Sequence, residues 1–216
     1  ERIGRAYEEI LAEVRRLPGV RAAAWTLHMP LTGGLEAFTI EAPGHADLPP
    51  NERMVFSHQV TDGYFAAAGV PLLAGNDLPR AGVPGMPSMV VSENLSRKFF
   101  GSAQAAVGQR LKPDNRDWMV ITGVAADAKF QHVREPNPPT VYLSYWDNRT
   151  TLGMTLVVNH AGSRQGLVTE IQALCARQAG RMPLMRVRTI AENVQASVQT
   201  ERMLAWLLSG FALFAL

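Results

Sequence analysis

The sequence lacks every short motif that would assign it a known catalytic chemistry. Neither G-x-x-x-x-G-K-[ST] nor G-x-G-x-x-G occurs, so ATP binding through a glycine-rich phosphate loop is excluded. G-x-S-x-G and H-E-x-x-H are also missing, and the single cysteine, Cys175, excludes an internal disulfide and a zinc site built on a cysteine pair. No run of Lys and Arg exceeds two residues and the net charge is only +2, which argues against nucleic acid as a partner.

The remaining candidates for chemistry are scattered side chains. The five histidines lie far apart in the sequence: His28, His45, His58, His132 and His160. We interpret them as satisfied or solvent-facing residues, and likewise the carboxylates Glu36, Glu41, Asp114 and Asp117 and the loop cations Lys129 and Arg134. Cys175 shares a helical face with Leu167, Ile171 and Leu174, which indicates a buried core thiol. The sequence therefore predicts no catalytic, cofactor-binding or metal-binding residue. A hydrolase would need a deep polar pocket joining His28 or His58 to Glu36 or Glu41.

The sequence does contain the pattern of a mixed α and β domain. Its 47% hydrophobic and 19% charged residues are enough to bury a core. Amphipathic periodicity and capping residues predict helices at 1–17, 61–70, 92–101 and 166–179, with Thr61 or Asp62, and then Ser92, as N-caps. Apolar runs and alternation predict strands at 20–30, 38–41, 54–60, 88–92, 117–127, 140–146, 154–159 and 183–190. A loop dense in Pro and Gly, 75–87, is the best candidate for a subdomain boundary.

The C-terminal segment changes character along its length. Thr189 and Glu192 form a capping box at the start of a predicted helix, whose apolar stripe is Ile190, Val194 and Val198. From residue 203 to 216 the chain has no charge, a pattern typical of a helix that enters a membrane, although too short to cross one. The predicted membrane-entry residues are Met203, Leu204, Trp206, Leu207, Leu208, Phe211, Leu213 and Phe214. The alternative is a buried C-terminal helix of a soluble core; we expect instead a fragment of a longer membrane protein.

Several stretches, in order and spacing, resemble one family. They are VTDGYFAAAGVPLLAGNDL (60–78), VVSENLSRKFFG with AVGQRL (90–111), VITGVAADAKFQHVREPNPPTVYLSYW (120–146) and the run from MTLVV to the apolar end. The sequence is similar to the MacB-like periplasmic core domain of FtsX/MacB-type (type VII) ABC transporter permeases. Within that family it resembles the acidobacterial-type permeases that carry two such halves.

The resemblance implies an α+β fold in two parts. Residues 18–78 and 151–189 would form a porter-like α/β subdomain, and residues 79–150 an inserted, mostly β subdomain. Residues 1–17 would be a stalk helix that follows a first membrane helix, and residues 190–216 a stalk that runs into a second one. The stalks would pack through Ile3, Tyr7, Ile10 and Val14 on one side and Ile190, Val194 and Val198 on the other.

The resemblance also implies a function, a location and partners. The domain would lie on the periplasmic side of the inner membrane and couple ATP hydrolysis to movement outside it, in efflux or mechanotransmission. The implied partners are a cytoplasmic ABC ATPase, a second permease copy or half, a periplasmic adaptor protein and the lipid bilayer, with no cofactor and no nucleic acid. The alternative is a membrane-anchored extracytoplasmic ligand-binding or sensory module without an ATPase.

Overall fold

The computed structural model describes residues 2–28, 36–45, 47–80, 87–114, 116–128, 137–147 and 153–179, together with Thr189 and Glu192. Its helices are α1 (Arg2–Val14), α2 (Tyr64–Ala68), α3 (Glu93–Phe100), α4 (Ala103–Ala106) and α5 (Arg164–Ala179), with 3-10 turns η1 (Pro50–Glu52) and η2 (Tyr145–Asp147). Its strands are β1 (Val20–Thr26), β2 (Glu36–Glu41), β3 (Met54–Val60), β4 (Leu72–Gly75), β5 (Ser88–Ser92), β6 (Arg110–Pro113), β7 (Met119–Ala125), β8 (Thr140–Ser144) and β9 (Thr155–His160).

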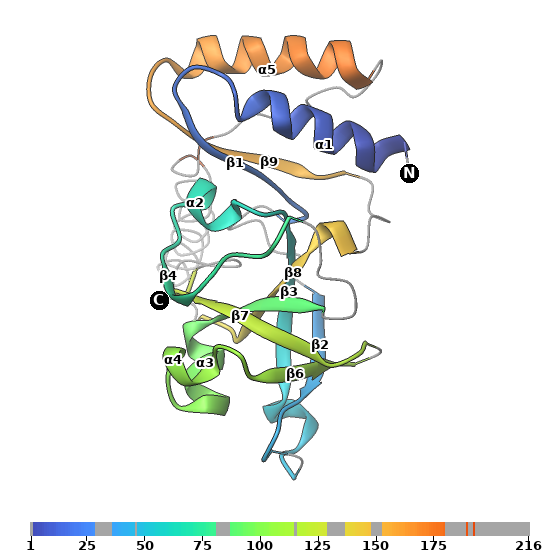
Figure 1. Ribbon diagram of the computed structural model, residues 1–216, viewed down its shortest axis with the longest axis vertical. Coiled ribbons are helices and arrows are strands. Elements are labelled where there is room, and N and C mark those ends of the chain that lie inside the picture. The colour runs from blue at the N-terminus through green and yellow to red at the C-terminus, as the bar shows by residue number, and fades with distance from the viewer. Residues whose placement is uncertain are drawn as a thin grey trace, which may run out of the picture.

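Six of these strands pair in a closed ring, which we call the barrel. The order is β2-β6-β7-β5-β8-β3, and β3 pairs back with β2. The pairs β3–β8 and β5–β7 are parallel and the other four are antiparallel. Met89 and Val91 of β5 and Val141 and Leu143 of β8 belong to one core cluster that contains residues of all six strands. Helices α3 and α4 contribute to the same cluster, so they cover the barrel (Figure 1).

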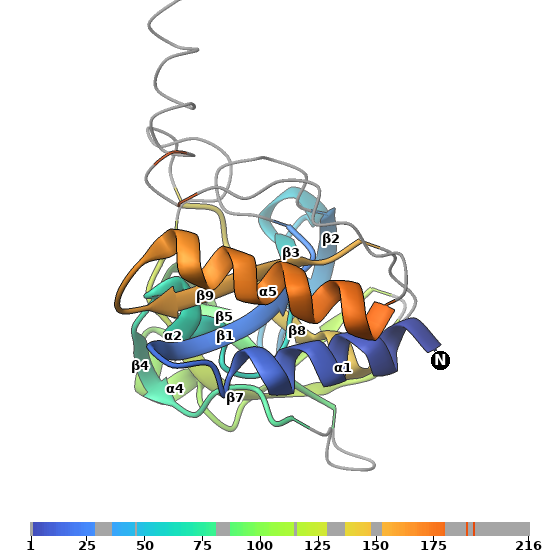
Figure 2. The same cartoon turned by 90° about the horizontal axis from the view of Figure 1, so that it is seen from above.

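The other half of the molecule is a small α/β layer. Strand β1 pairs antiparallel with β9 along its length, and with the barrel only through Thr26 and Val60 of β3. Helices α1 and α5 lie side by side and antiparallel on one face of β1 and β9, while α2 lies on the other (Figures 1 and 2). One core cluster joins α1, α5 and β1, and a second joins β1, α2 and the outer face of the barrel.

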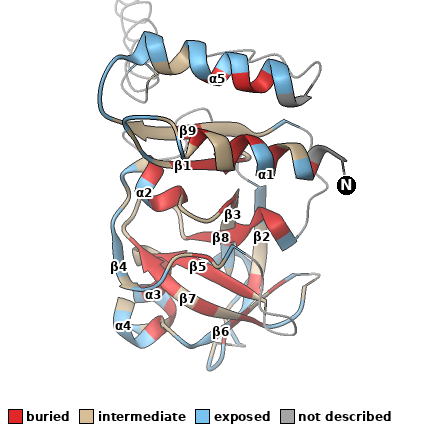
Figure 3. Cartoon of the chain, turned by 45° about the horizontal axis from the view of Figure 1, so that its top comes forward, coloured by how far each residue is buried: buried red, intermediate tan, exposed pale blue. Residues whose placement is uncertain are grey.

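Alternation along the strands explains how one sheet serves two cores. Figure 3 shows buried residues along β5, β7 and β8. On β5 and β8 the residues between the barrel-facing ones, Val90 and Tyr142, face the cluster under α2 instead. Successive side chains of a strand point to opposite faces, so a strand buried on both sides is apolar throughout. The interpretation of 117–127 as a strand is confirmed, with β7 occupying its middle. Cover on both sides is only partial, because Val120 and Thr122 of β7 are half-buried.

Local capping signals are mostly where the sequence places them. The Ser92 side chain accepts a hydrogen bond from Leu95 N, and Gly101 ends α3 with φ 81°. The predicted cap of α2 is wrong: the helix begins after Gly63, with φ 78°, because Thr61 and Asp62 are engaged elsewhere. The capping box of the C-terminal segment is confirmed, since Thr189 N donates to Glu192 Oε2 (2.9 Å) and Glu192 N donates to Thr189 Oγ1 (3.0 Å).

The mixed α and β composition is confirmed, and three short elements, β4, β6 and α4, are additions to the expected ones. Strand pairing crosses the predicted boundary at 78/79, because β2, β3 and β4 pair with β6, β8 and β7 respectively. The division into two subdomains stays a prediction. The predicted strand 183–190, apart from Thr189, and the membrane-entry residues lie outside the described residues. Within the part of the chain that the structure describes, no helix has both the length and the apolar character to cross a membrane.

Candidate functional site

The structure brings two of the five candidate histidines, His28 and His58, close together. The rings of His28 and His58 lie 6.1 Å apart, because Thr26 of β1 lies next to Val60 of β3. Glu36 is close enough to oppose the lowering of the His28 pKa that burial causes. Glu41 instead pairs with Lys112 on the surface (3.2 Å). Among the described residues, no group of three His, Cys, Asp or Glu side chains is placed to hold a metal ion.

The other scattered candidates remain apart. His45 contacts the carbonyl oxygen of Phe99 through Nε2 (3.0 Å), and Asp114 bonds to Thr39 on the surface. His160 ends β9, and His132, Lys129 and Arg134 lie outside the described residues. Cys175 is buried as predicted, and burial raises the pKa of its thiol.

His58 is fully buried beneath α2. Its Nε2 lies 2.7 Å from Thr26 Oγ1, and the Thr26 hydroxyl donates to the His28 carbonyl (3.0 Å). A hydroxyl has one proton to give, so this network assigns the donor role to His58 Nε2. Burial first, and the neighbouring His28 second, lower the pKa of His58 to about 3. The imidazole is therefore neutral near pH 7 and unsuited to act as a general base there.

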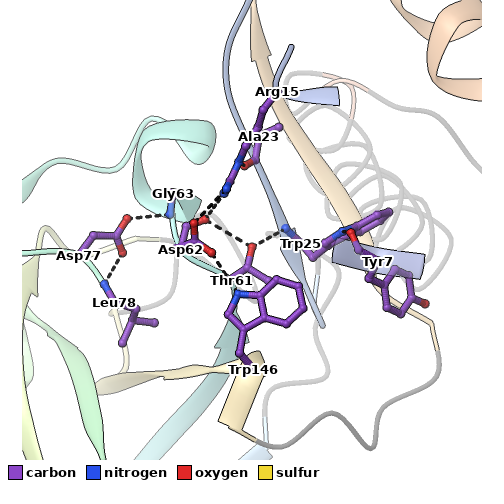
Figure 4. A network of polar contacts seen from close by, with 10 residues as sticks. All are labelled: Tyr7, Arg15, Ala23, Trp25, Thr61, Asp62, Gly63, Asp77, Leu78 and Trp146. Carbon is purple, nitrogen blue, oxygen red and sulfur yellow. Dashed lines mark hydrogen bonds and ion pairs between the residues drawn. The ribbon is translucent and has the colours of Figure 1, made fainter. Parts of the chain in front are cut away.

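A second polar cluster, which we call the Arg15 clamp, joins the α/β layer to the barrel (Figure 4). Arg15 follows the last turn of α1, and its Nε donates to Ala23 O of β1 (2.9 Å). Nη1 donates to Asp62 Oδ2 (2.9 Å) and Nη2 to the Asp62 carbonyl (2.6 Å). The clamp is partly shielded, since the side chains of Arg15 and Asp62 are 28% and 18% exposed. One guanidinium thus holds the end of α1, β1 and the turn between β3 and α2.

Asp62 has a second partner, at the end of the neighbouring barrel strand β8. Trp146 of η2, which follows β8, donates its indole Nε1–H to Asp62 Oδ1 (3.0 Å). Both carboxylate oxygens of Asp62 are therefore bound, one by a cation and one by an indole. Charge-assisted bonds of this kind are shorter and stronger than neutral ones.

The same turn is bound to β1 through Thr61. Trp25 N donates to Thr61 Oγ1, and Thr61 N donates to Trp25 O, both at 2.9 Å. The Trp25 indole in turn donates to the Tyr7 carbonyl of α1 (2.9 Å), and the Tyr7 hydroxyl accepts from Gly153 N and Met154 N, each at 3.2 Å. A chain of hydrogen bonds thus runs from the loop before β9 through α1 to the barrel.

Asp77 extends the cluster to the loop after β4. Its Oδ2 accepts from Gly63 N (2.9 Å) and its Oδ1 from Leu78 N (2.6 Å). Burial raises the pKa of Asp77, although these two N–H donors oppose the shift. Gly63 itself is required at its position, because a Cβ there would lie 3.0 Å from Arg15 Nη2 and φ is 78°.

The arrangement is suited to holding parts together rather than to chemistry. Its polar atoms bind one another, and no nucleophile and base form a pair within it. The clamp was not predicted from the sequence, in which Asp62 was one of two possible caps of α2 and Arg15 was not singled out. The only sequence signal was the Asp62-Gly63 pair, which predicts a turn but not a partner.

The predicted stalk face of α1 has partners in the structure. Tyr7, Ile10 and Val14 are buried in the cluster that also contains Trp25 and residues of α5. Nothing is described for the side chain of Ile3, and Ile190, Val194 and Val198 lie outside the described residues, as do Met203, Leu204, Trp206, Leu207, Leu208, Phe211, Leu213 and Phe214. Packing between the two predicted stalks therefore stays a prediction.

The described residues define a class of fold: a closed six-stranded ring that carries an α/β layer, with a polar cluster at the joint between them. The family model of the MacB-like periplasmic core domain matches residues 3–174. The chain belongs to this family, whose members are periplasmic domains of ABC-type transporter permeases.

Solved structures agree on the fold. The chain is similar to the periplasmic region of MacB from Actinobacillus actinomycetemcomitans, with a TM-score of 0.55 and 12% identity over 81% of this chain and 75% of that one. It is also similar to the extracellular domain of the noncanonic ABC-type transporter YknZ from Gram-positive bacteria, with a TM-score of 0.53 and 14% identity over 82% and 86% of the two chains. Among curated proteins, none matches the chain.

Proposed function

We propose that this chain is the extracytoplasmic domain of an ABC-type transporter permease, and that it couples ATP hydrolysis in the cytoplasm to movement of a substrate or partner protein outside the membrane. A separate ABC ATPase subunit or domain hydrolyses the ATP, and this domain acts without a catalytic site or cofactor of its own. The nucleotide-driven movement reaches it through the stalk helices as a rigid-body or hinge change.

The observation that carries the proposal is the family match over residues 3–174. The positions of the flanking segments support it. Helix α1 lies beside α5, and Glu192, near the start of the C-terminal segment, pairs with Arg164 at the first residue of α5 (2.6 and 3.3 Å). Helix α1 and Glu192 thus both contact α5, and this supports the proposal of two stalks that leave the same helical layer.

The proposal includes the partners of such a permease. These are the cytoplasmic ATPase, a second permease copy or the second half of a duplicated acidobacterial-type permease, a periplasmic adaptor protein and the bilayer of the inner membrane. Residues 203–216 enter that bilayer as the start of a membrane helix.

The test is topological and uses the full-length permease. In a Cys175→Ser background, one cysteine replaces Asn51, which is exposed in η1, and intact spheroplasts receive a membrane-impermeant thiol reagent. We expect labelling without lysis. The matched control is Val91→Cys, whose fully buried position should label only after unfolding. Labelling of Asn51→Cys only after lysis would place the domain in the cytoplasm and overturn the proposal. Failure of any P-loop ATPase to co-purify would favour the anchored sensory module.

A further inference from the structure

We propose that Arg15 is a positioning residue for this coupling: it makes α1 and the barrel move as one body. The inference rests on the proposed function, because it concerns the route by which a displacement of α1 reaches the barrel. Arg15 contacts no substrate; it acts by fixing Asp62 and the turn that follows β3.

Such a residue is needed because the pairing between β1 and β3 is short. The strand pairing between the α/β layer and the barrel consists of one residue pair, Thr26 with Val60, and the two backbone bonds around it. A ladder this short resists bending and twisting weakly, since each ladder bond constrains only its neighbours. Apolar packing under α2, and packing of Tyr145 and Trp146 of η2 against Tyr7 and Trp25, adds cohesion, but it is non-directional. Directional bonds from α1 to the barrel therefore determine whether the joint is stiff.

Arg15 supplies these bonds from the residue directly after α1. Three of its nitrogens bind three acceptors, one on β1 and two on the β3–α2 turn. Lysine has a single nitrogen and cannot reproduce this planar fork, although it keeps the charge. Because Trp146 holds the other carboxylate oxygen of Asp62, the clamp also reaches the end of β8. A displacement of α1 is thus transmitted to both β3 and β8, which pair with each other.

The neighbouring Arg16 provides a matched control. Its side chain is 75% exposed and bonds to Glu13 of the same helix segment. That pair is short-range and surface-exposed, so it ties no other element to α1. Replacing Arg16 removes the same charge one residue away and leaves the joint intact.

The experiment uses the full-length permease with its ATPase in lipid nanodiscs, with Cys175 replaced by Ser. Nitroxide labels are placed at Glu9 of α1 and Gln104 of α4, both exposed, and labelled permease is diluted with unlabelled permease. Double electron–electron resonance measures the 9–104 distance distribution without nucleotide and with a trapped ATP analogue. A second sample labelled at position 104 and in the membrane part reports how far the barrel moves.

In the wild type we expect the same narrow 9–104 distance distribution without nucleotide and with the ATP analogue. The distance from position 104 to the membrane part should change between these two states. Arg15→Gln should broaden the 9–104 distribution and reduce the nucleotide response of the barrel at least twofold. Arg15→Lys should resemble Arg15→Gln rather than the wild type, because the fork and not the charge is required. Arg16→Gln should match the wild type.

Two outcomes overturn the inference. The first is a folded Arg15→Gln variant with an unchanged 9–104 distribution and an unchanged barrel response. If that variant does not fold, Arg15→Lys decides: it keeps the charge but not the three-bond fork, and an unaltered 9–104 distribution would refute the clamp. If the distance from position 104 to the membrane part does not change with nucleotide in the wild type, the proposed function is contradicted. The width of the 9–104 distribution without nucleotide would still test the role of Arg15.

Discussion

The burial of His58 as a neutral imidazole predicts a specific loss of stability in mild acid. In the unfolded chain its pKa returns to about 6.5, whereas in the folded chain burial holds it at about 3. A group whose folded pKa is depressed binds protons more readily when unfolded, so stability is complete above the unfolded pKa and falls as the pH falls below it. The affected window runs from about pH 6.5 down to about pH 3.

The magnitude follows from these two values. Between about pH 7.5 and about pH 4.5, the unfolded histidine gains nearly a full proton and the folded one gains almost none. The corresponding loss in the free energy of unfolding is about 2.6 kcal/mol. Because pH 4.5 lies above the folded pKa, this loss is set almost entirely by the titration of the unfolded state.

The assay compares wild type with His58→Phe by urea unfolding at the two pH values. Fluorescence of the buried Trp25 and Trp146 reports the transition. The wild type should lose about 2.6 kcal/mol more than the variant, since the variant has no imidazole to protonate at that position. Thr26→Val is the matched control: it removes the hydrogen-bond partner but keeps the burial, so it should retain the extra acid sensitivity. Equal losses in wild type and His58→Phe would refute the packing of α2 over His58.

Three further predictions concern single residues elsewhere. Gly123→Ala should destabilise the chain by about 1–3 kcal/mol, seen as a lower urea midpoint, because its Cβ would lie 2.2 Å from Asn76 O; an unchanged midpoint would contradict the close approach of β4 to β7. Gly166→Ala in α5 should raise the free energy of unfolding by up to about 1 kcal/mol, seen as a higher urea midpoint, since nothing lies within 4 Å of the added Cβ; a lower midpoint would contradict a helix there. Cys175, 4% exposed, should react with a thiol reagent much faster in urea than in buffer; equal rates would show that α5 does not cover it.

Local signals in the sequence predicted the elements that have local causes. Ser92 and Gly101 mark the ends of α3, and Thr189 with Glu192 marks a helix start, because each cap involves residues within a few positions of one another. The strands β4 and β6 were missed for the opposite reason. Each has four residues, too few to show alternation, and each exists because it pairs with β7.

The polar clusters could not be predicted because their partners are distant in the sequence. Arg15 and Asp62 are 47 positions apart, and Asp62 and Trp146 are 84 apart. An arginine at the end of an amphipathic helix resembles any solvated charge until the partner strand is known. His28 and His58 were each placed on strands, but their approach depends on the β1–β3 pairing, which the sequence does not specify.

The joint between layer and barrel is short in its backbone and strengthened by side chains. Around the single pair of Thr26 and Val60, Thr26 binds His58 and Trp25 binds Thr61, each through a side-chain atom. The Arg15 clamp adds an ion pair one residue further on, at Asp62. The Thr26–His58 bond is buried and uncharged, so it is insensitive to salt, whereas the clamp is partly exposed and carries charge. Replacement of His58 by Phe should therefore weaken this joint by removing the bond to Thr26, and removal of the guanidinium should weaken it through Asp62. If both substitutions broaden the 9–104 distance distribution in the same way, then the joint as a whole transmits the movement, rather than either residue alone.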